Sequence, residues 1–242
     1  MAGDNPLAEF FGEHLKELRN RVLIVFVAIA LLSAVAYIFI ESIAFFFMAP
    51  IFRAAPDLSH LVYTHLTEAF ISYLKLAVLT GLAGSFPVLC YEVWMFISPG
   101  LVRREKQIAA LVTLLASALF VAGGAFAYFV ALPRILAFLM AFSGPQLEPL
   151  PRLDLYLTFV ARTILAFGLA FEIPFLMVAS QRTGLVHGRY FREKRWLSYA
   201  AMLMLAFLLT AGEVVGALLL AVPLVLLFET GVLLSRLVGA KS

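Results

Sequence analysis

Six long apolar segments follow one another in this chain, and they constrain its fold more than any other feature. A helix rises about 1.5 Å per residue and the hydrocarbon core of a bilayer is about 30 Å thick, so about 20 apolar residues make one crossing. Hydrophobic residues make up 63% of the chain and charged residues only 14%. These values predict an all-α polytopic membrane protein with six transmembrane helices, forming a single integral membrane domain over residues 1–242. The predicted spans are Val22–Ile40, Ala69–Phe96, Ile108–Leu132, Leu155–Ser180, Leu197–Ala211 and Val214–Leu234.

The last two predicted spans are short and nearly continuous. Leu197–Ala211 would reach only about 22 Å, and Gly212 and Glu213 alone separate it from Val214–Leu234. Two short crossings joined by a tight turn predict a locally thinned bilayer on that side. A single re-entrant hairpin is the alternative.

The distribution of basic residues predicts the orientation. Of the 16 lysines and arginines outside the spans, 13 lie on one side, and the other side has only Arg53, Arg134 and Arg152. Cytoplasmic loops carry the excess of positive charge, so both termini are expected in the cytoplasm, which requires an even number of spans.

The two longer external loops, Glu41–Glu68 and Pro133–Asp154, are unusually apolar. We expect short interfacial helices that cap the outer mouth of a concave bundle. Five prolines are expected to break these loops into pieces: Pro50, Pro56, Pro145, Pro149 and Pro151. The segment before the first span predicts an amphipathic helix with Pro6 at its first position, serving either as a binding element or as a lead into the span.

Glu172 lies inside an apolar segment, in the run FGLAFEIP. An ionised carboxylate near the bilayer centre costs about 2.5–3.5 kcal/mol on insertion scales, so it needs a cavity, a bundle interior or a partner. Pro174 cannot donate to the carbonyl of Ala170, and Gly168 lies one turn before Glu172 on the same face. We expect this face to be open to lipid. A protonated Glu172 hydrogen-bonded between helices is the alternative. Lys75 and Arg162 also lie within spans and are expected to snorkel or pair locally.

Several function classes find no support in the sequence. The net charge of +3 is too small to indicate nucleic-acid binding. Cys90 is the only cysteine, and the four histidines show no metal-ligand spacing. We find no phosphate-binding loop or catalytic constellation, so no enzyme activity, metal or other cofactor is expected.

Four motifs in order resemble the TatC family, the polytopic core subunit of the twin-arginine protein translocase. HLKELRNR is similar to H-L-x-E-L-R-x-R, and FPVLCYEVWMFISPGL is similar to P-x-x-x-x-Q-x-W-x-F-x-x-P-G-L. FGLAFEIP is similar to F-G-x-x-F-E-x-P, and AVPLVLLFE is similar to A-x-P followed by L-[YF]-E. The motifs extend from Glu13 to Arg236.

The chain departs from the family pattern at two places. Glu92 stands where the family usually has Gln. The segment Thr210–Ala217 replaces T-P-P-D-x-x-S-Q, and it keeps the acid as Glu213 but lacks the Ser-Gln pair. A contact of that pair with a partner subunit is therefore in doubt, while Gly212 and Gly216 would allow close helix approach.

The resemblance implies a receptor for signal peptides with paired arginines, carried by folded cargo proteins. Carboxylates accept two parallel hydrogen bonds from a guanidinium, and Glu17 and Glu105 are acids at the same predicted membrane face. The alternative is a pair of solvated acids that balance nearby basic residues such as Arg19. The resemblance also implies that Phe96, Pro99, Gly100 and Leu101 shape the adjoining pocket, with Arg19 beside it and Pro50 in the external cap.

The resemblance further implies residence in the cytoplasmic (inner) membrane and assembly into homo- or hetero-oligomers. Small single-span subunits of the TatA and TatB type would dock a polar group at Glu172, with Gly168, Pro174 and Glu213 contributing to this docking region. A proton-coupled secondary transporter with Glu172 as its proton site is the alternative function. The missing inverted repeat argues against it.

Overall fold

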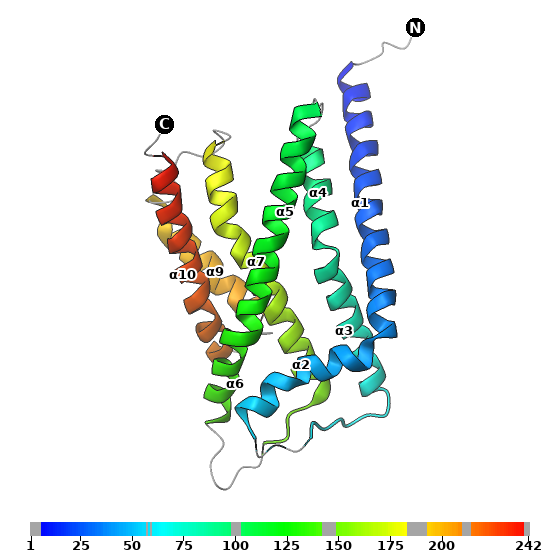
Figure 1. Ribbon diagram of the computed structural model, residues 1–242, viewed down its shortest axis with the longest axis vertical. Helices are drawn as coiled ribbons and strands as arrows, with labels where there is room; N and C mark the ends of the chain where they lie inside the picture. Colours follow the sequence, from blue (N-terminus) through cyan, green and yellow to red (C-terminus); the bar gives the residue numbers. More distant parts are fainter. Residues whose placement is uncertain are drawn as a thin grey trace. The chain divides into compact units, whose positions relative to one another are not determined.

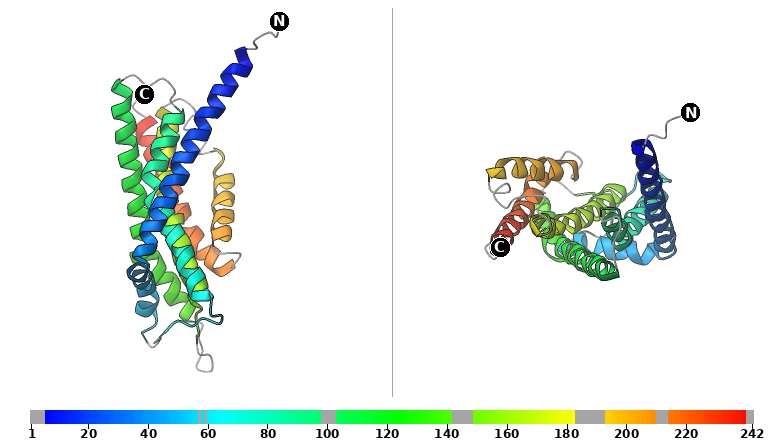
Figure 2. Two further views of the ribbon diagram at one scale, coloured as in Figure 1. Left: turned by 90° about the vertical axis from the view of Figure 1, so that its right-hand side faces the viewer. Right: turned by 90° about the horizontal axis from the view of Figure 1, so that it is seen from above.

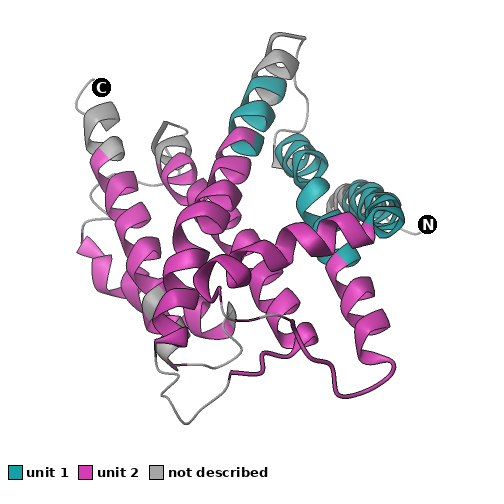
Figure 3. Cartoon of the chain, turned by 60° about the horizontal axis from the view of Figure 1, so that its bottom comes forward, with its two compact units in different colours: residues 1–39, 77–117 teal, residues 40–76, 118–242 magenta. Residues whose placement is uncertain are grey.

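The computed structural model describes residues 6–56, 58, 60–97, 103–141, 149–182, 193–209 and 214–239. Within these ranges every regular element is a helix (Figure 1), and one isolated bridge pairs Val62 with Arg152. The all-α prediction is confirmed. The chain divides into two compact units, coloured separately in Figure 3. Unit 1 consists of Met1–Phe39 and Ala77–Ser117, and unit 2 consists of Ile40–Leu76 and Ala118–Ser242.

Three helical stretches in the described residues are long and apolar enough to cross a membrane: Leu15–Ile38, Ala110–Met140 and Leu153–Met177. The pair α3 (Glu68–Gly84) and α4 (Phe86–Ile97) forms a fourth crossing if it is counted as one broken span. Shorter apolar helices at Arg195–Leu208 and Leu220–Leu233 stand where the fifth and sixth spans were predicted. This pattern agrees with a polytopic protein of six transmembrane helices.

The second predicted span is bent by 48° between α3 and α4, which the sequence analysis did not predict. Pro87 lies just after the break and has no N–H for the carbonyl of Ala83. The buried Ser85 hydroxyl donates to the Leu82 carbonyl at 2.9 Å, so part of the backbone hydrogen bonding lost at the break is replaced locally.

In unit 1, helix α1 (Pro6–Ile38) packs against α4. Pro6 is the first described residue and already lies in this helix, so the predicted helix start there stays a prediction. Because α1 runs unbroken into the first span, the N-terminal segment leads into the span and is not a separate surface helix.

In unit 2, helix α2 (Ile40–Ala54) confirms that the first loop predicted to be external contains a short helix. Two expectations for these loops were wrong. Pro50 lies inside α2 and does not break it. The third span also continues beyond its predicted end, since α5 (Arg103–Phe126) leads into the π-helical turn η1 (Ala127–Ala131) and then α6 (Leu132–Met140). Pro133 falls in the first turn of α6, directly after the π-helical turn η1.

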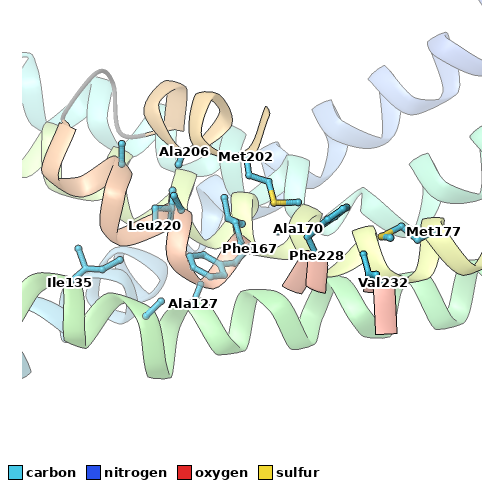
Figure 4. Close-up of a cluster of buried hydrophobic side chains, with 14 residues drawn as sticks. Ala127, Ile135, Phe167, Ala170, Met177, Met202, Ala206, Leu220, Phe228 and Val232 are labelled. Carbon is cyan, nitrogen blue, oxygen red and sulfur yellow. The ribbon is translucent and has the colours of Figure 1, made fainter. Parts of the chain in front are cut away.

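The core of unit 2 forms where α7 (Leu153–Arg182), α9 (Arg195–Leu209) and α10 (Val214–Gly239) pack together (Figures 2 and 4). Phe167 of α7 and Leu224 of α10 are fully buried there. Lipid tails are as apolar as these side chains, so the helices associate through close packing more than through exclusion of water. Small residues such as Ala170, Ala206 and Ala217 in this core allow that close packing.

Candidate functional site

A cluster of three charged side chains in unit 1 joins α1 to α4. The Arg21 guanidinium donates from Nε and Nη2 to Glu17 Oε1, at 3.1 and 2.6 Å, and from Nη1 to Glu92 Oε2 at 2.9 Å. Glu17 and Arg21 face each other because they are four residues apart on one helix. The side chains are 36%, 19% and 12% exposed for Glu17, Arg21 and Glu92, so the ion pairs are largely sheltered. Two carboxylates here hold one guanidinium between two helices.

The other predicted peptide-binding residues are described to different extents. Arg19 is exposed on α1, and Phe96 is half-buried near the end of α4. Glu105 lies in the first turn of α5, and its side chain is outside the described residues. Pro99, Gly100 and Leu101 also lie outside the described residues. Among these candidates, Glu17 is positioned by its ion pair with Arg21.

Sequence reasoning missed Glu92 as a site residue. Its pairing with Arg21 spans 71 positions, so no local spacing indicated it. The pairing of Glu17 with Arg21 was readable from the four-residue spacing in HLKELRNR.

Glu172 is buried within unit 2, and only 6% of the residue is exposed. The expectation that it faces a lipid-open surface was wrong for the chain as described here. Its neighbours in sequence, Phe171 and Ile173, pack against the apolar core. Glu172 Oε1 is buried and has no hydrogen-bond partner among the described residues. The described part of the chain thus leaves a carboxyl oxygen unsatisfied in an apolar interior, which is costly.

Neighbours within the chain occupy the surroundings of Glu172. A Cβ added at Gly168 would lie 2.6 Å from the ring of Phe120 on α5, so the close neighbour of this glycine is an aromatic side chain of the same unit. Pro174 lies within the continuous helix α7, and Gly231 of α10 approaches its Cα. Glu213 lies outside the described residues.

Pro50 is buried in α2 and changes the hydrogen bonding around it. A proline has no N–H, so the carbonyl of Phe46, four residues earlier, lacks its helical donor. The Tyr128 hydroxyl donates to that carbonyl at 2.8 Å. The Tyr156 hydroxyl accepts from the Ile51 N–H at 3.2 Å and donates to the Phe47 carbonyl at 3.0 Å. Two tyrosines therefore fasten α2 to η1 and α7.

A second polar cluster joins α9 to α10. The Tyr199 hydroxyl donates to Glu229 Oε1, and Arg195 Nη2 lies 3.5 Å from Glu229 Oε2. Glu229 is the acid of the LFE motif, and in this structure it links the last two predicted spans. No group of three or more His, Cys, Asp or Glu side chains that could hold a metal ion occurs among the described residues.

Comparisons with known proteins agree with this arrangement. The family model described as "Sec-independent protein translocase protein (TatC)" matches residues 13–223. A TatC protein of Desulforapulum autotrophicum is 36% identical over 231 residues, covering 96% of this chain and 86% of that protein. The Escherichia coli TatC is 32% identical over 228 residues, covering 94% and 88%.

A solved structure supports the same relationship. A crystal structure of the twin-arginine translocase receptor TatC superposes with a TM-score of 0.85 at 31% identity, covering 93% of this chain and 99% of that one. A second TatC crystal structure, in the detergent DDM, gives a TM-score of 0.82 at 30% identity. This chain therefore belongs to the TatC family of Sec-independent protein translocases.

Proposed function

We propose that this chain is the receptor subunit that binds twin-arginine signal peptides of folded cargo proteins, within a translocase of the cytoplasmic (inner) membrane. The observation that supports the proposal is a pair of ion contacts to the guanidinium of Arg21. Its Nη2 lies 2.6 Å from Glu17 Oε1, and its Nη1 lies 2.9 Å from Glu92 Oε2. Glu17 can offer a peptide arginine the kind of charge-assisted hydrogen bond that it forms with Arg21. A lysine ammonium cannot match the planar fork of a guanidinium, so such a site favours paired arginines.

The cluster also offers acceptor capacity beyond Arg21. Both contacts of Arg21 with Glu17 use Oε1, so Arg21 leaves Oε2 of Glu17 open to another donor. Glu105 follows α4 in the first turn of α5 and belongs to the same compact unit. In this proposal Glu17 and Glu105 each accept one arginine of the peptide, and Phe96, Pro99, Gly100 and Leu101 form the apolar side of the pocket with Arg19 beside it.

Binding of synthetic signal peptides to the purified chain tests this proposal. We expect Glu17→Gln and Glu105→Gln each to weaken binding of an Arg-Arg peptide by more than about 1 kcal/mol, the upper range of an exposed ion pair. The double variant should bind Arg-Arg and Lys-Lys peptides equally. Glu41→Gln, which removes an exposed acid of α2, is the matched control and should bind normally.

A further variant separates recognition from the internal ion pair. Arg21→Gln removes the guanidinium but leaves both carboxylates, so it should keep the preference for Arg-Arg over Lys-Lys peptides. Normal binding by both Glu17→Gln and Glu105→Gln would show that the carboxylate assignment is wrong. Loss of the preference in Arg21→Gln alone would assign recognition to the intact internal cluster.

For Glu172 we propose docking of a polar group from the membrane helix of a small single-span subunit of the TatA or TatB type. Its unsatisfied Oε1 supports this, because a buried acceptor without a partner costs about 1–3 kcal/mol. Since Glu172 is buried, docking requires surrounding side chains to move aside. Gly168, Pro174 and Glu213 remain proposed neighbours of that partner, and the whole assembly is a homo- or hetero-oligomer.

Stability and assembly should respond to Glu172 in opposite directions. Glu172→Met removes the unsatisfied group at similar length, so the isolated chain should gain up to about 1–3 kcal/mol while partner crosslinking at position 172 is lost. Glu172→Gln should retain crosslinking better than Glu172→Ala, since an amide still forms hydrogen bonds. Crosslinks only within the chain, with Gln and Ala equally inactive in transport, would favour a proton-binding role over docking.

The orientation that accompanies this function has both termini in the cytoplasm. Its support is the excess of basic residues on one side of the predicted spans. The proposed role is binding and transport and involves no catalysis. Nothing in the described residues favours the alternative of a proton-coupled transporter.

A further inference from the structure

An open groove of about 600 Å³ lies in unit 2, and the proposed peptide receptor function does not use it. It is formed by residues of α2, α3, α6 and α7 together with the connection that precedes α7. Its charged lining residues are Lys75, Arg152, Asp154 and Arg162. Its volume is in the range of binding sites for small molecules.

Two of the three cations in the groove have no counter-charge among the residues that the structure describes. Arg152 is paired, since Nη2 lies 3.4 Å from Glu68 Oε2 and Nε lies 3.3 Å from Asp154 Oδ1. Lys75 and Arg162 are exposed, and neither has a hydrogen bond or ion pair with any residue that the structure describes. They carry the same charge, so they cannot neutralise each other. The groove therefore presents two free positive charges.

Both cations stand well inside membrane-crossing helices. Lys75 is seven residues from the start of α3 and Arg162 is nine residues from the start of α7. At 1.5 Å per residue these positions lie about 10 and 14 Å along their helices, within the outer half of a bilayer of about 30 Å. Unpaired cations at such depth are costly and mark sites where an anion or water enters.

The rest of the lining is apolar and suits hydrocarbon chains. Leu139 and Met140 of α6 face the groove together with Leu155 and Phe159 of α7. A ligand that fits must combine an anionic group with an apolar tail. We propose that the groove binds an anionic phospholipid of the outer leaflet, whose phosphodiester contacts Lys75 and Arg162 while its acyl chains lie on α6 and α7.

The chemistry of the two cations fits a phosphodiester. Arg162 can form two parallel hydrogen bonds to phosphate oxygens, and Lys75 adds a compact point charge. The groove opens to the surroundings, so a lipid can enter sideways without unfolding of the unit.

Native mass spectrometry of the full-length chain tests the proposal with defined lipids. The detergent-solubilised protein is mixed with phosphatidylglycerol or phosphatidylcholine of the same acyl chains, and retained lipids are counted. We expect selective retention of phosphatidylglycerol, reduced roughly tenfold in the Lys75→Gln/Arg162→Gln double variant. The control Arg53→Gln/Arg134→Gln removes the same charge from exposed positions of unit 2 outside the groove, and should retain lipid like the wild type. Equal loss in both double variants would overturn the assignment to the groove.

Two further experiments identify which ligand occupies the groove. Inorganic phosphate in excess should not displace the bound phosphatidylglycerol, because it lacks the apolar chains; full displacement would make the groove a site for soluble phosphate. A photoreactive residue at position 139, irradiated in native membranes, should give lipid adducts that depend on Lys75 and Arg162. Protein adducts with the same dependence would overturn the lipid and assign the groove to an acidic partner helix.

Discussion

Pro50 and Tyr128 should be energetically coupled, because the proline creates a hydrogen-bonding deficit that the tyrosine meets. The Phe46 carbonyl has no helical donor at position 50, and the Tyr128 hydroxyl supplies one at 2.8 Å. The Tyr128 ring also stacks on Phe46, with centroids 4.2 Å apart. Replacing Tyr128 by Phe keeps the ring and removes only the donor.

The unfolding free energy lost on Tyr128→Phe depends on whether the Phe46 carbonyl can accept a hydrogen bond from another donor. In the wild type, Tyr128→Phe leaves a partly buried carbonyl unpaired, which should cost about 1–2 kcal/mol of unfolding free energy. In a Pro50→Ala background the new backbone N–H can donate to Phe46, so the same change should cost less than about 0.5 kcal/mol. The effects of Pro50→Ala on the unfolded chain and on packing cancel in the double-mutant cycle, which leaves a coupling of about 1 kcal/mol.

Unfolding by sodium dodecyl sulfate in mixed micelles, followed by circular dichroism, gives the four free energies. Tyr199→Phe is the control, because the Tyr199 hydroxyl donates to Glu229 on α10 and not to α2. Its cost should be equal with Pro or Ala at position 50. If Tyr128→Phe costs the same in both backgrounds, within about 0.3 kcal/mol, the carbonyl at Phe46 does not depend on Tyr128 and the reasoning fails.

Two other predictions concern packing and orientation. Gly168→Ala should destabilise the chain by about 1–3 kcal/mol in the same unfolding assay, because its Cβ would meet the Phe120 ring at 2.6 Å. Gly84→Ala, whose Cβ would meet only the end of Leu32 at 3.6 Å, should be nearly neutral, and similar costs for both would refute the clash. In a chain whose single Cys90 is replaced, cysteines at positions 104 and 192 should react only with reagent from the cytoplasmic side, and one at 148 only from outside. The opposite labelling pattern would contradict both the orientation and the topology.

The fold class and the positions of the apolar segments could be predicted from the sequence, because they depend on local composition. The apolar segments predicted an all-α membrane protein, and most span positions agree with the helices observed. The four motifs predicted the family, which the comparisons confirm. The face shared by Glu17 and Arg21 also follows from the four-residue helical spacing.

Only the tertiary structure shows which side chains of different helices contact one another. Pro50 in isolation predicted a break, but hydroxyl groups of Tyr128 and Tyr156 from distant segments satisfy the backbone and keep α2 continuous. Glu172 predicted an open polar face, yet its burial depends on which helices surround α7.

The same distinction applies to the two charged sites. Glu17 and Arg21 are neighbours by helical spacing, whereas Glu92 joins them across 71 positions. Lys75 and Arg162 looked like isolated intramembrane cations in the sequence, and the fold places both in one groove. A single sequence determines local helix formation and hydrophobicity, because both arise within a few residues. It does not determine which polar groups find partners, because that depends on how the helices pack.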